Sequence, residues 1–376
     1  MRIIVWTNSF WPQIGGVEVL GARLFPALKA RGHEFLIVTR RISISLPGEA
    51  IYCGIPVYRF PTLQALNEGD VDQLAQIRQQ MFKLKLNFRP DLIYFYHVGP
   101  DVFLYREIIQ DHSIPVLATL HGTFPDQCFL SHTLIGEVLR SADWITACSA
   151  AVLDKTRQQL PEIVSSSSVI ANSLEEPHVD PTPISFEAPK LLCVGRAVAQ
   201  KGFDLVLIAL ASIIHRFPTL RLVIAGDGES LPELKQQAAR LQINNHVEFM
   251  GWVIPEKIPA LINESTMVVV PSREEPFGLV ALQASQMARP VVASWVGGLS
   301  EIIVDTETGL LVEKEDVRTL ADAIAFLLDH PKVAIGMGEN GRKRTHEIFN
   351  WSLYVDAYDQ LFHQLGQNVC SYESAD

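Results

Sequence analysis

Two cationic side chains, Arg196 and Lys201, lie five positions apart between a predicted strand at 190–195 and an apolar helical stretch at 203–216. The pattern predicts a strand-to-helix loop that carries both cations. Two cations at such a position can neutralise the negative charge that develops on a departing diphosphate. The loop lacks the G-K-[ST] order of a Walker sequence, which argues against an NTPase P-loop. The alternative interpretation is a solvated pair of loop residues.

A carboxylate, Glu275, lies in a turn between a predicted strand at 267–270 and a predicted helix at 278–288. The first amides of that helix, at 278–280, are expected to be available to an anion. A carboxylate beside a phosphate site suits the hydroxyls of a sugar joined to that phosphate. The segment therefore favours a sugar-phosphate site. The alternative is that Glu274 and Glu275 merely complement the helix dipole.

A glycine pair, Gly15 and Gly16, opens a predicted helix at 16–31 soon after a predicted strand at 2–7. Glycines at this position let backbone N–H groups approach an anion at the positive end of the helix. The G-x-G-x-x-G fingerprint is absent, which disfavours a nicotinamide dehydrogenase. A plain turn is the alternative.

Two histidines, His97 and His121, follow predicted strands at 91–96 and 115–119. A ring nitrogen at the end of a strand could hydrogen-bond a sugar hydroxyl or a phosphate. Neither histidine has a cysteine or a carboxylate at ligand spacing, so together they are too few for a zinc site. Each could equally be an ordinary loop residue with satisfied hydrogen bonds.

Strand-like and helix-like segments alternate along the chain, which is typical of parallel sheets covered by helices, so we expect an α/β fold. The predicted strands lie at 2–7, 35–39, 56–60, 91–96, 115–119, 144–148, 168–171, 190–195, 221–225, 246–250, 267–270, 290–293 and 310–312. The predicted helices lie near 16–31, 71–87, 100–110, 149–159, 203–216, 230–241, 278–288, 317–329 and 351–366.

The segment 173–189 contains four prolines and has no apolar periodicity, so we interpret it as a linker. It separates an N-terminal domain at 1–172 from a C-terminal domain at 190–350. Both domains are expected to be Rossmann-like and doubly wound. Because ligands of open parallel sheets bind at the carboxyl ends of the strands, we expect the two sheets to face a central cleft.

Composition narrows the possible partners. Residues 1–172 carry equal numbers of acidic and basic side chains, so residues 173–376 account for the whole net charge of −11. Such a surface disfavours nucleic acid, which requires a basic stripe. No apolar run reaches the roughly 18 residues that span a bilayer, and the first residues do not form a signal-peptide core. The five cysteines are scattered, so we expect reduced thiols and a cytoplasmic protein.

Taken together, the order and spacing of several short motifs resemble the family 4 glycosyltransferases, which have the GT-B fold. The resemblance covers nearly the whole chain. It is carried by Gly15-Gly16-Val17-Glu18, Arg31-Gly32-His33, Thr119-Leu120-His121-Gly122, Gly195-Arg196, Lys201-Gly202, Ala225-Gly226-Asp227-Gly228, Glu275-Pro276-Phe277-Gly278-Leu279-Val280, Gly297-Gly298-Leu299-Ser300-Glu301 and Thr308-Gly309-Leu310-Leu311-Val312.

The resemblance implies transfer of a sugar from a nucleoside-diphosphate donor to an acceptor hydroxyl, with retention at the anomeric carbon. It implies that Glu275 and His121 are catalytic and that a C-terminal helix from Trp351, at 351–376, packs back on the N-terminal domain. The acceptor-side residues it implies are Glu18 and His97. The donor-binding residues it implies are Gly15, Gly16, Arg196, Lys201, Phe277, Gly278, Leu279, Val280 and Gln283.

The sequence departs from the family pattern at two positions. Gln283 replaces the second carboxylate of the family's E-x7-E element, which usually binds ribose hydroxyls; glutamine still donates and accepts hydrogen bonds, but without charge. Asn172-Ser173 replaces a common Asn-Gly. Two other functions therefore stay open: a nucleotide-sugar epimerase on the same fold, and a catalytically silent sugar-nucleotide-binding protein.

No metal or other cofactor is expected, because Arg196 and Lys201 would take the place of an ion at the diphosphate. Asp70-Val71-Asp72 is the only D-x-D sequence, and it opens an amphipathic helix, so we interpret it as a helix cap. If the acceptor is a lipid, basic residues on and after that helix could contact the inner membrane face; a solvated face is the alternative. These residues are Arg78, Lys83, Lys85 and Arg89.

Overall fold

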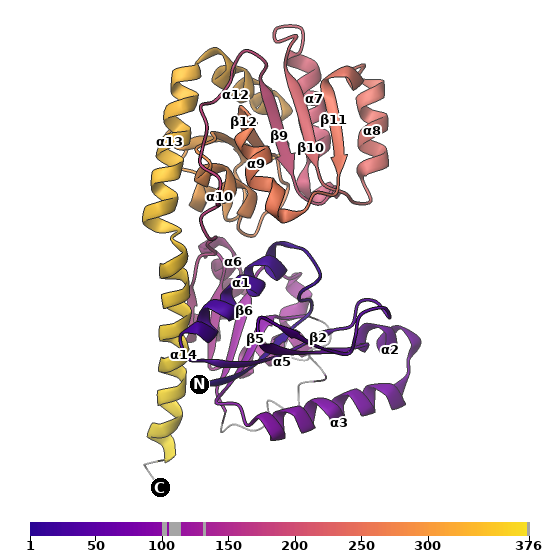
Figure 1. Cartoon of the computed structure of the whole chain (residues 1–376), viewed down its shortest axis with the longest axis vertical. Coiled ribbons are helices and arrows are strands. Elements are labelled where there is room, and N and C mark those ends of the chain that lie inside the picture. The colour runs from indigo at the N-terminus through magenta and orange to yellow at the C-terminus, as the bar shows by residue number, and fades with distance from the viewer. Residues whose placement is uncertain (100–103, 105–113, 131–132, 374–376) are drawn as a thin grey trace. The chain divides into compact units, whose positions relative to one another are not determined.

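The chain folds into two units in the computed structural model, which describes residues 1–99, 104, 114–130 and 133–373 (Figure 1). The first unit comprises Met1–Ala171 together with Ser352–Asp376, and the second comprises Asn172–Trp351. Each unit has its own sheet, and the segment 173–189 belongs to the second unit. The predicted α/β class is confirmed.

The first unit is built on an eight-stranded sheet of order β3-β4-β2-β1-β5-β6-β7-β8. All neighbours pair in parallel except β3 and β4, which form an antiparallel hairpin through Cys53 and Gly54, both with positive φ. The strands are β1 (Arg2–Thr7), β2 (Glu34–Arg40), β3 (Glu49–Tyr52), β4 (Ile55–Phe60), β5 (Leu92–His97), β6 (Val116–Leu120), β7 (Trp144–Ala147) and β8 (Ser167–Val169).

Helices of the first unit pack on this sheet through apolar faces. In α1, the buried residues Leu20, Leu24 and Leu28 recur every four positions, which places them on one face of the helix. In α14, Tyr358 and Phe362 are fully buried, and Tyr358 contacts the ring of Tyr94 in β5. The helices are α1 (Gly16–Ala30), α2 (Thr62–Glu68), α3 (Val71–Phe88), α5 (Leu134–Ser141), α6 (Ala150–Gln159) and α14 (Trp351–Glu373).

The second unit is built on a six-stranded parallel sheet of order β11-β10-β9-β12-β13-β14. Strands β12 and β13 are short, buried along their whole length and rich in valine, as is typical of parallel strands covered on both faces. The strands are β9 (Lys190–Val194), β10 (Arg221–Ala225), β11 (Val247–Gly251), β12 (Met267–Val270), β13 (Val291–Ser294) and β14 (Gly309–Val312).

The covering helices of the second unit include α13, which the sequence did not predict. α13 contains three glycines, which lower helix propensity. One of them, Gly338, lies against Ala288, the second residue after α10, because a Cβ there would come 2.1 Å from the backbone oxygen of Ala288. The helices are α7 (Phe203–Ile213), α8 (Leu231–Arg240), α9 (Ile258–Asn263), α10 (Leu279–Gln286), α11 (Leu299–Ile302), α12 (Val317–Asp329) and α13 (Pro331–Ile348).

The segment 173–189 has no helix or strand, and hydrogen bonds tie it to the second unit. Arg289, which is buried, donates from Nη2 to the carbonyl of Thr182 at 2.9 Å and from Nε to the carbonyl of Ser265 at 2.9 Å. Burial lowers the pKa of Arg289 to about 10, so its guanidinium remains charged at neutral pH. Because these two bonds go to backbone oxygens, Arg289 fixes the segment to the elements beside it.

Most predicted elements agree with the structure to within a few residues. The elements not predicted are β3, α2, α5, α9, α11 and α13, and the helix predicted near 100–110 lies outside the described residues apart from Leu104. Within the described part of the chain, no helix is long and apolar enough to cross a bilayer.

Candidate functional site

The strand order of the second sheet reverses between β9 and β12, which are neighbours in the sheet but not in the sequence. The loops that leave their carboxyl ends diverge to opposite faces, and a crevice at such a point is the usual ligand site of an open parallel sheet. Residues 195–202 follow β9, and residues 271–278 follow β12. The switch point therefore brings together the two loops in which the sequence placed its cations and its carboxylate.

The central feature of these loops is an ion pair between Lys201 and Glu275. The Lys201 Nζ atom lies 2.6 Å from Oε2 of Glu275, and the side chains are 25% and 12% exposed. Ser272 donates from Oγ to the same carboxylate oxygen at 3.1 Å. Because both bonds end on Oε2, the carboxylate is held in one orientation at a partly desolvated position.

The loop after β9 is pressed against the loop after β12. Gly202 follows Lys201 with φ of +66°, and a Cβ at this position would lie 2.1 Å from the carbonyl oxygen of Pro271. A larger residue would meet both backbone strain and a backbone clash. Gly202 is therefore required for the approach that brings Lys201 to Glu275.

A third cation, Arg273, ties the same two loops together, and sequence reasoning missed it. Its guanidinium pairs with both carboxylate oxygens of Asp204, at 2.9 and 2.7 Å, and with Glu315 at 2.8 Å. It also donates to the carbonyl of Ala199 at 2.6 Å. The hydrogen bonds with Asp204 are the main cause that raises the pKa of Arg273, so it stays charged. No local motif signals this role, because the partners are distant in sequence.

The backbone of Glu275 rests on the glycine pair that follows β13. The N–H of Gly298 donates to the carbonyl of Glu275 at 3.1 Å, and a Cβ at Gly297 would lie 2.0 Å from that oxygen. A Cβ at Gly298 would lie 2.5 Å from Cα of Phe277. The pair thus allows the turn that presents Glu275 to lie directly on the neighbouring loop.

Helix α10 begins beside this turn. Gly278 precedes it with φ of +112°, and the first amides of the helix, from Leu279 and Val280, have no acceptor within the helix. Phe277 is buried against the ring of Phe349 at 5.9 Å, which anchors the turn. Gln283 lies half-buried within the same helix. An anion near Leu279 would meet both the free N–H groups and the positive end of the helix dipole.

Arg196 lies on the same loop as Lys201, but the structure does not place it in the ion pair. Its side chain is exposed, and the described residues give its guanidinium no hydrogen bond or salt bridge. The preceding Gly195 has φ of +144°, and Gly226 packs on it so closely that a Cβ at Gly226 would lie 1.7 Å from the carbonyl oxygen of Gly195. The backbone at Arg196 is therefore fixed, while its side chain is exposed to solvent.

In the first unit, the corresponding switch point lies between β1 and β5. Gly15 caps α1 with an extended backbone, and Gly16 is the first residue of the helix. The carboxylate of Glu18 folds back over this helix end, accepts a hydrogen bond from Ser9, and would lie 2.3 Å from a Cβ at Gly15. Glu18 is therefore a negative group at the positive end of α1.

His97 ends β5 and His121 follows β6, so the two strands bring them together. Their ring centroids lie 6.3 Å apart, and the ring of Tyr96 contacts that of His121 at 4.6 Å. Both ring nitrogens of His121 are buried without a hydrogen-bond partner among the described residues. Burial, with a smaller contribution from His97, lowers the pKa of His121 to about 3, so it is a neutral imidazole at neutral pH.

Asp70 and Lys85 lie on or beside α3. The Asp70 side chain accepts a hydrogen bond from the N–H of Gln73 at 2.8 Å, so the predicted helix cap is confirmed. Lys85 was expected on the exposed basic face of α3, but this is wrong, because Lys85 is only 5% exposed. The buried residues Ile77, Met81 and Lys85 follow one another by one helical turn, so Lys85 lies on the buried side of the helix.

Two family models match consecutive parts of the chain. The model described as glycosyltransferase family 4 matches residues 14–174, and the model described as glycosyl transferases group 1 matches residues 176–344. The second match contains both loops of the Lys201–Glu275 pair, and the first contains Glu18, His97 and His121.

Relatives and solved structures agree with these matches. Glycogen synthase from Mycobacterium tuberculosis is 26% identical over 397 residues, which cover 96% of this chain and 94% of the relative. The structure of sucrose-phosphate synthase from Thermosynechococcus elongatus superposes with a TM-score of 0.83 at 22% identity, over 97% of this chain and 98% of that chain. The structure of HepE from Anabaena in complex with UDP-glucose gives a TM-score of 0.74 at 20% identity, over the whole of both chains. These similarities show a GT-B fold.

Proposed function

Because the chain belongs to glycosyltransferase family 4 and is a glycosyltransferase, we propose that it moves a hexose from a nucleoside diphosphate to an acceptor hydroxyl with retention at the anomeric carbon. The acceptor hydroxyl belongs to a glycan, a lipid or a small molecule. The base and the sugar of the donor are the open parts of this proposal, and the HepE complex makes UDP-glucose the first donor to test.

The observation that carries the proposal is the Lys201–Glu275 pair beside the start of α10. An ammonium, two or more free helix amides and a carboxylate lie within one pair of touching loops. A diphosphate fits the ammonium and the amides, because both donate hydrogen bonds and both carry full or partial positive charge. A sugar attached to that diphosphate fits the carboxylate, whose Oε1 is not engaged by Lys201 or Ser272 and can accept from a hydroxyl.

In the proposed reaction, the bond between the anomeric carbon and the diphosphate oxygen breaks while the acceptor oxygen bonds to that carbon on the same face. The acceptor proton passes to the departing diphosphate. Lys201, Arg196 and the amides of Leu279 and Val280 stabilise the negative charge that grows on the diphosphate. Glu275 orients the sugar and stabilises the positive charge that develops on its ring.

The remaining residues take supporting roles in this proposal. Gln283 binds the ribose hydroxyls through uncharged hydrogen bonds. Gly15 and Gly16 allow backbone to approach the diphosphate, and the neutral imidazole of His121 hydrogen-bonds the donor sugar. Burial keeps His121 uncharged, so it can donate from one nitrogen and accept at the other. On the acceptor side we place Glu18 and His97.

We propose that Arg196 and Lys201 take the place of a metal ion at the diphosphate. The charge of two side chains can offset that of the leaving group without an ion. The supporting observation is that Asp70, in the only D-x-D sequence, is occupied as the cap of α3. Transfer should therefore persist in the presence of a strong chelator.

We place the enzyme in the cytoplasm, where the free thiols of the described cysteines, including exposed Cys53, stay reduced. If the acceptor is a lipid, α3 offers a surface for contact with an anionic membrane. Its exposed side includes Phe82 and Leu86 next to Lys83, which combines apolar and cationic groups. Sedimentation with anionic and neutral vesicles tests this contact.

The proposal is tested by a panel of nucleotide sugars, scored by the shift in melting temperature and then by nucleoside diphosphate release with acceptors. We expect one donor to raise the melting temperature, and Lys201→Ala to abolish the shift, while Lys314→Ala, an exposed lysine of the same unit, retains it. NMR of the product shows whether the anomeric configuration is retained. Conversion of the donor without acceptor would indicate an epimerase, and binding without release would indicate a silent binding protein.

A further inference from the structure

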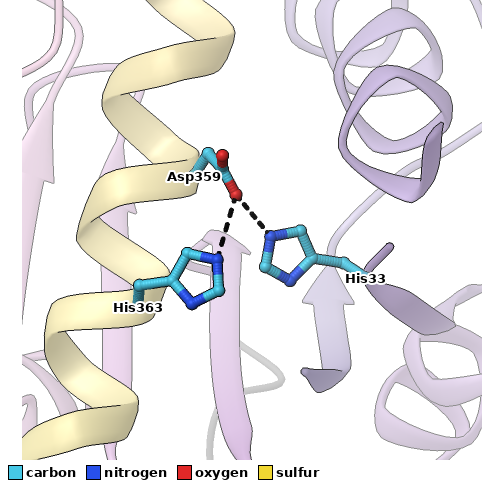
Figure 2. Close-up of side chains that lie close together, drawn as sticks. All are labelled: His33, Asp359 and His363. Atoms are coloured by element: carbon cyan, nitrogen blue, oxygen red, sulfur yellow. Dashed lines mark hydrogen bonds and ion pairs between the residues drawn. The ribbon is translucent and has the colours of Figure 1, made fainter. Parts of the chain in front are cut away.

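A cluster of metal-ligating side chains lies in the first unit, apart from the loops described above. His33, in the turn between α1 and β2, faces Asp359 and His363, which lie one turn apart on α14 (Figure 2). One ligand atom from each residue lies within 4.8 Å of the other two. We propose that these three residues form a binding site for a divalent transition metal ion, of which Zn²⁺ is the best match.

The distances fit a small ion after a slight opening. The Oδ1 atom of Asp359 lies 2.7 Å from Nε2 of His33 and 3.5 Å from Nε2 of His363. Tetrahedral zinc with bonds of about 2.1 Å holds its ligand atoms about 3.4 Å apart. The Asp359–His363 distance already matches this value. The distance between Asp359 and His33 must increase for an ion to bind. A rotation of the exposed His363 ring would bring its ligand nitrogen to a similar distance from that of His33.

The carboxylate is oriented by a cation on its other oxygen. Arg31 donates from Nη1 to Oδ2 of Asp359 at 3.3 Å and pairs through Nη2 with Asp356 at 2.5 Å. Oδ1 is thereby directed towards the two histidines. The charge of Arg31 also opposes a second cation nearby, which is one reason to expect moderate rather than tight binding.

The position of His33 favours metal coordination. Its side chain is 1% exposed, and its Nε2 atom already lies 2.7 Å from Oδ1 of Asp359, so the ring is held where a metal ion would bind. Coordination through Nε2 would leave the ring proton on Nδ1. That atom is buried without a hydrogen-bond partner among the described residues, which also limits affinity. Two imidazoles and a carboxylate are typical ligands of zinc and of neighbouring first-row ions.

Metal binding at this position would join α14 to the turn before β2. The three ligands come from segments more than 300 positions apart in the chain, so the ion would bridge the C-terminal helix and the strand layer of its own unit. His363 is 58% exposed, which leaves a path for the ion and coordination positions for water. The inference is independent of the proposed transfer reaction.

The test uses the full chain, freed of metal by a chelator and titrated with Zn²⁺ by calorimetry in a Cys53→Ser background, which removes an exposed thiol. We expect one ion per chain at micromolar affinity and a rise in melting temperature. His363→Ala should weaken binding by about a hundredfold. His363 is exposed, so this variant should fold. His215→Ala, an exposed histidine of the second unit, is the matched control and should bind as the parent does.

Cobalt provides a second readout. Co²⁺ at the site should give visible absorption bands that disappear in both His363→Ala and Asp359→Asn. Zinc binding that is unchanged in His363→Ala would overturn the proposal, as would the absence of zinc binding by the parent protein at 100-fold excess over micromolar protein.

Discussion

The Nζ atom of Lys201 lies 2.6 Å from Oε2 of Glu275, although the two residues are separated by 74 positions in the chain. The contact exists because β9 and β12 are neighbours at the point where the strand order of the second sheet reverses. Each residue is partly buried, so solvent screens the pair less than it would a surface pair. The same ammonium and carboxylate are the groups we assign to the diphosphate and the sugar.

Replacing Glu275 with glutamine should lower turnover about a hundredfold, because a preorganised charge near the reacting carbon is lost while shape is kept. Glu274→Gln is a matched control, since Glu274 is adjacent, exposed and outside the ion pair. Steady-state kinetics with the donor that the nucleotide-sugar panel selects measure both variants. Equal rates for Glu275→Gln and the parent would remove Glu275 from the proposed site.

Gly297→Ala should destabilise the second unit by about 2–4 kcal/mol. Gly297 has φ of +50°, and its new Cβ would lie 2.0 Å from the carbonyl oxygen of Glu275, which cannot move independently of the turn. Donor binding should weaken in the same variant, because the turn carries Glu275. Urea unfolding and the donor-induced melting shift measure the two effects.

Gly336→Ala is the control for this prediction. Gly336 lies within α13, and a Cβ there would meet nothing within 4 Å. Alanine at this position should stabilise the protein by about 0.4–1 kcal/mol, because it restricts the unfolded chain. Similar stability of the two alanine variants would show that the approach of Gly297 to Glu275 does not matter.

The two loops of the site could be predicted from the sequence, because the strand and helix patterns that define each loop lie directly beside it in the chain. The short apolar run before Arg196 and the helical period after Lys201 define a strand-to-helix loop, and an apolar run and a helical period likewise flank Glu275. Capping by Asp70 was predictable for the same reason, since its partner Gln73 is three positions away.

Long-range and glycine-dependent features could not be predicted in this way. Arg273 reaches Asp204 and Glu315, which are 69 and 42 positions away, and no periodicity encodes such a pairing. In α13, the glycines that allow close packing on a neighbour also lower the helical signal. Lys85 was placed on the solvated face because its charge outweighed its position on the helix, where it follows the buried residue Met81 by one turn.

Gln283→Glu should lower the dissociation constant of the donor about three- to tenfold, because a charge-assisted hydrogen bond is stronger than an uncharged one. Residue 283 is half-buried in α10, so solvent would only partly screen the interaction of the new carboxylate with the donor. Gln236→Glu, on the exposed side of α8, is the control and should leave affinity unchanged. Calorimetric titration with donor measures the difference. Weaker binding by Gln283→Glu would contradict the assignment of Gln283 to the ribose.

The buried imidazole of His121 should make the protein less stable as the solution is acidified. Its pKa is lowered to about 3 in the folded chain by burial, whereas an unfolded histidine titrates near 6.5. Below about pH 6.5 the unfolded chain therefore binds a proton that the folded chain does not, and the free energy of unfolding falls as the pH falls towards 3. The loss from this one group is at most about 1.4 kcal/mol per pH unit.

Urea unfolding of the parent and of His121→Gln between pH 7.5 and 5 isolates this contribution. The variant should be less stable at pH 7.5, because it loses packing against Tyr96, but its stability should decline less steeply with acid. His215→Gln replaces an exposed histidine and should retain the slope of the parent. If the stability of His121→Gln fell with acid as steeply as that of the parent, His121 would bind a proton as readily in the folded chain as in the unfolded chain. Its role as a neutral donor and acceptor towards the sugar would then have to be abandoned.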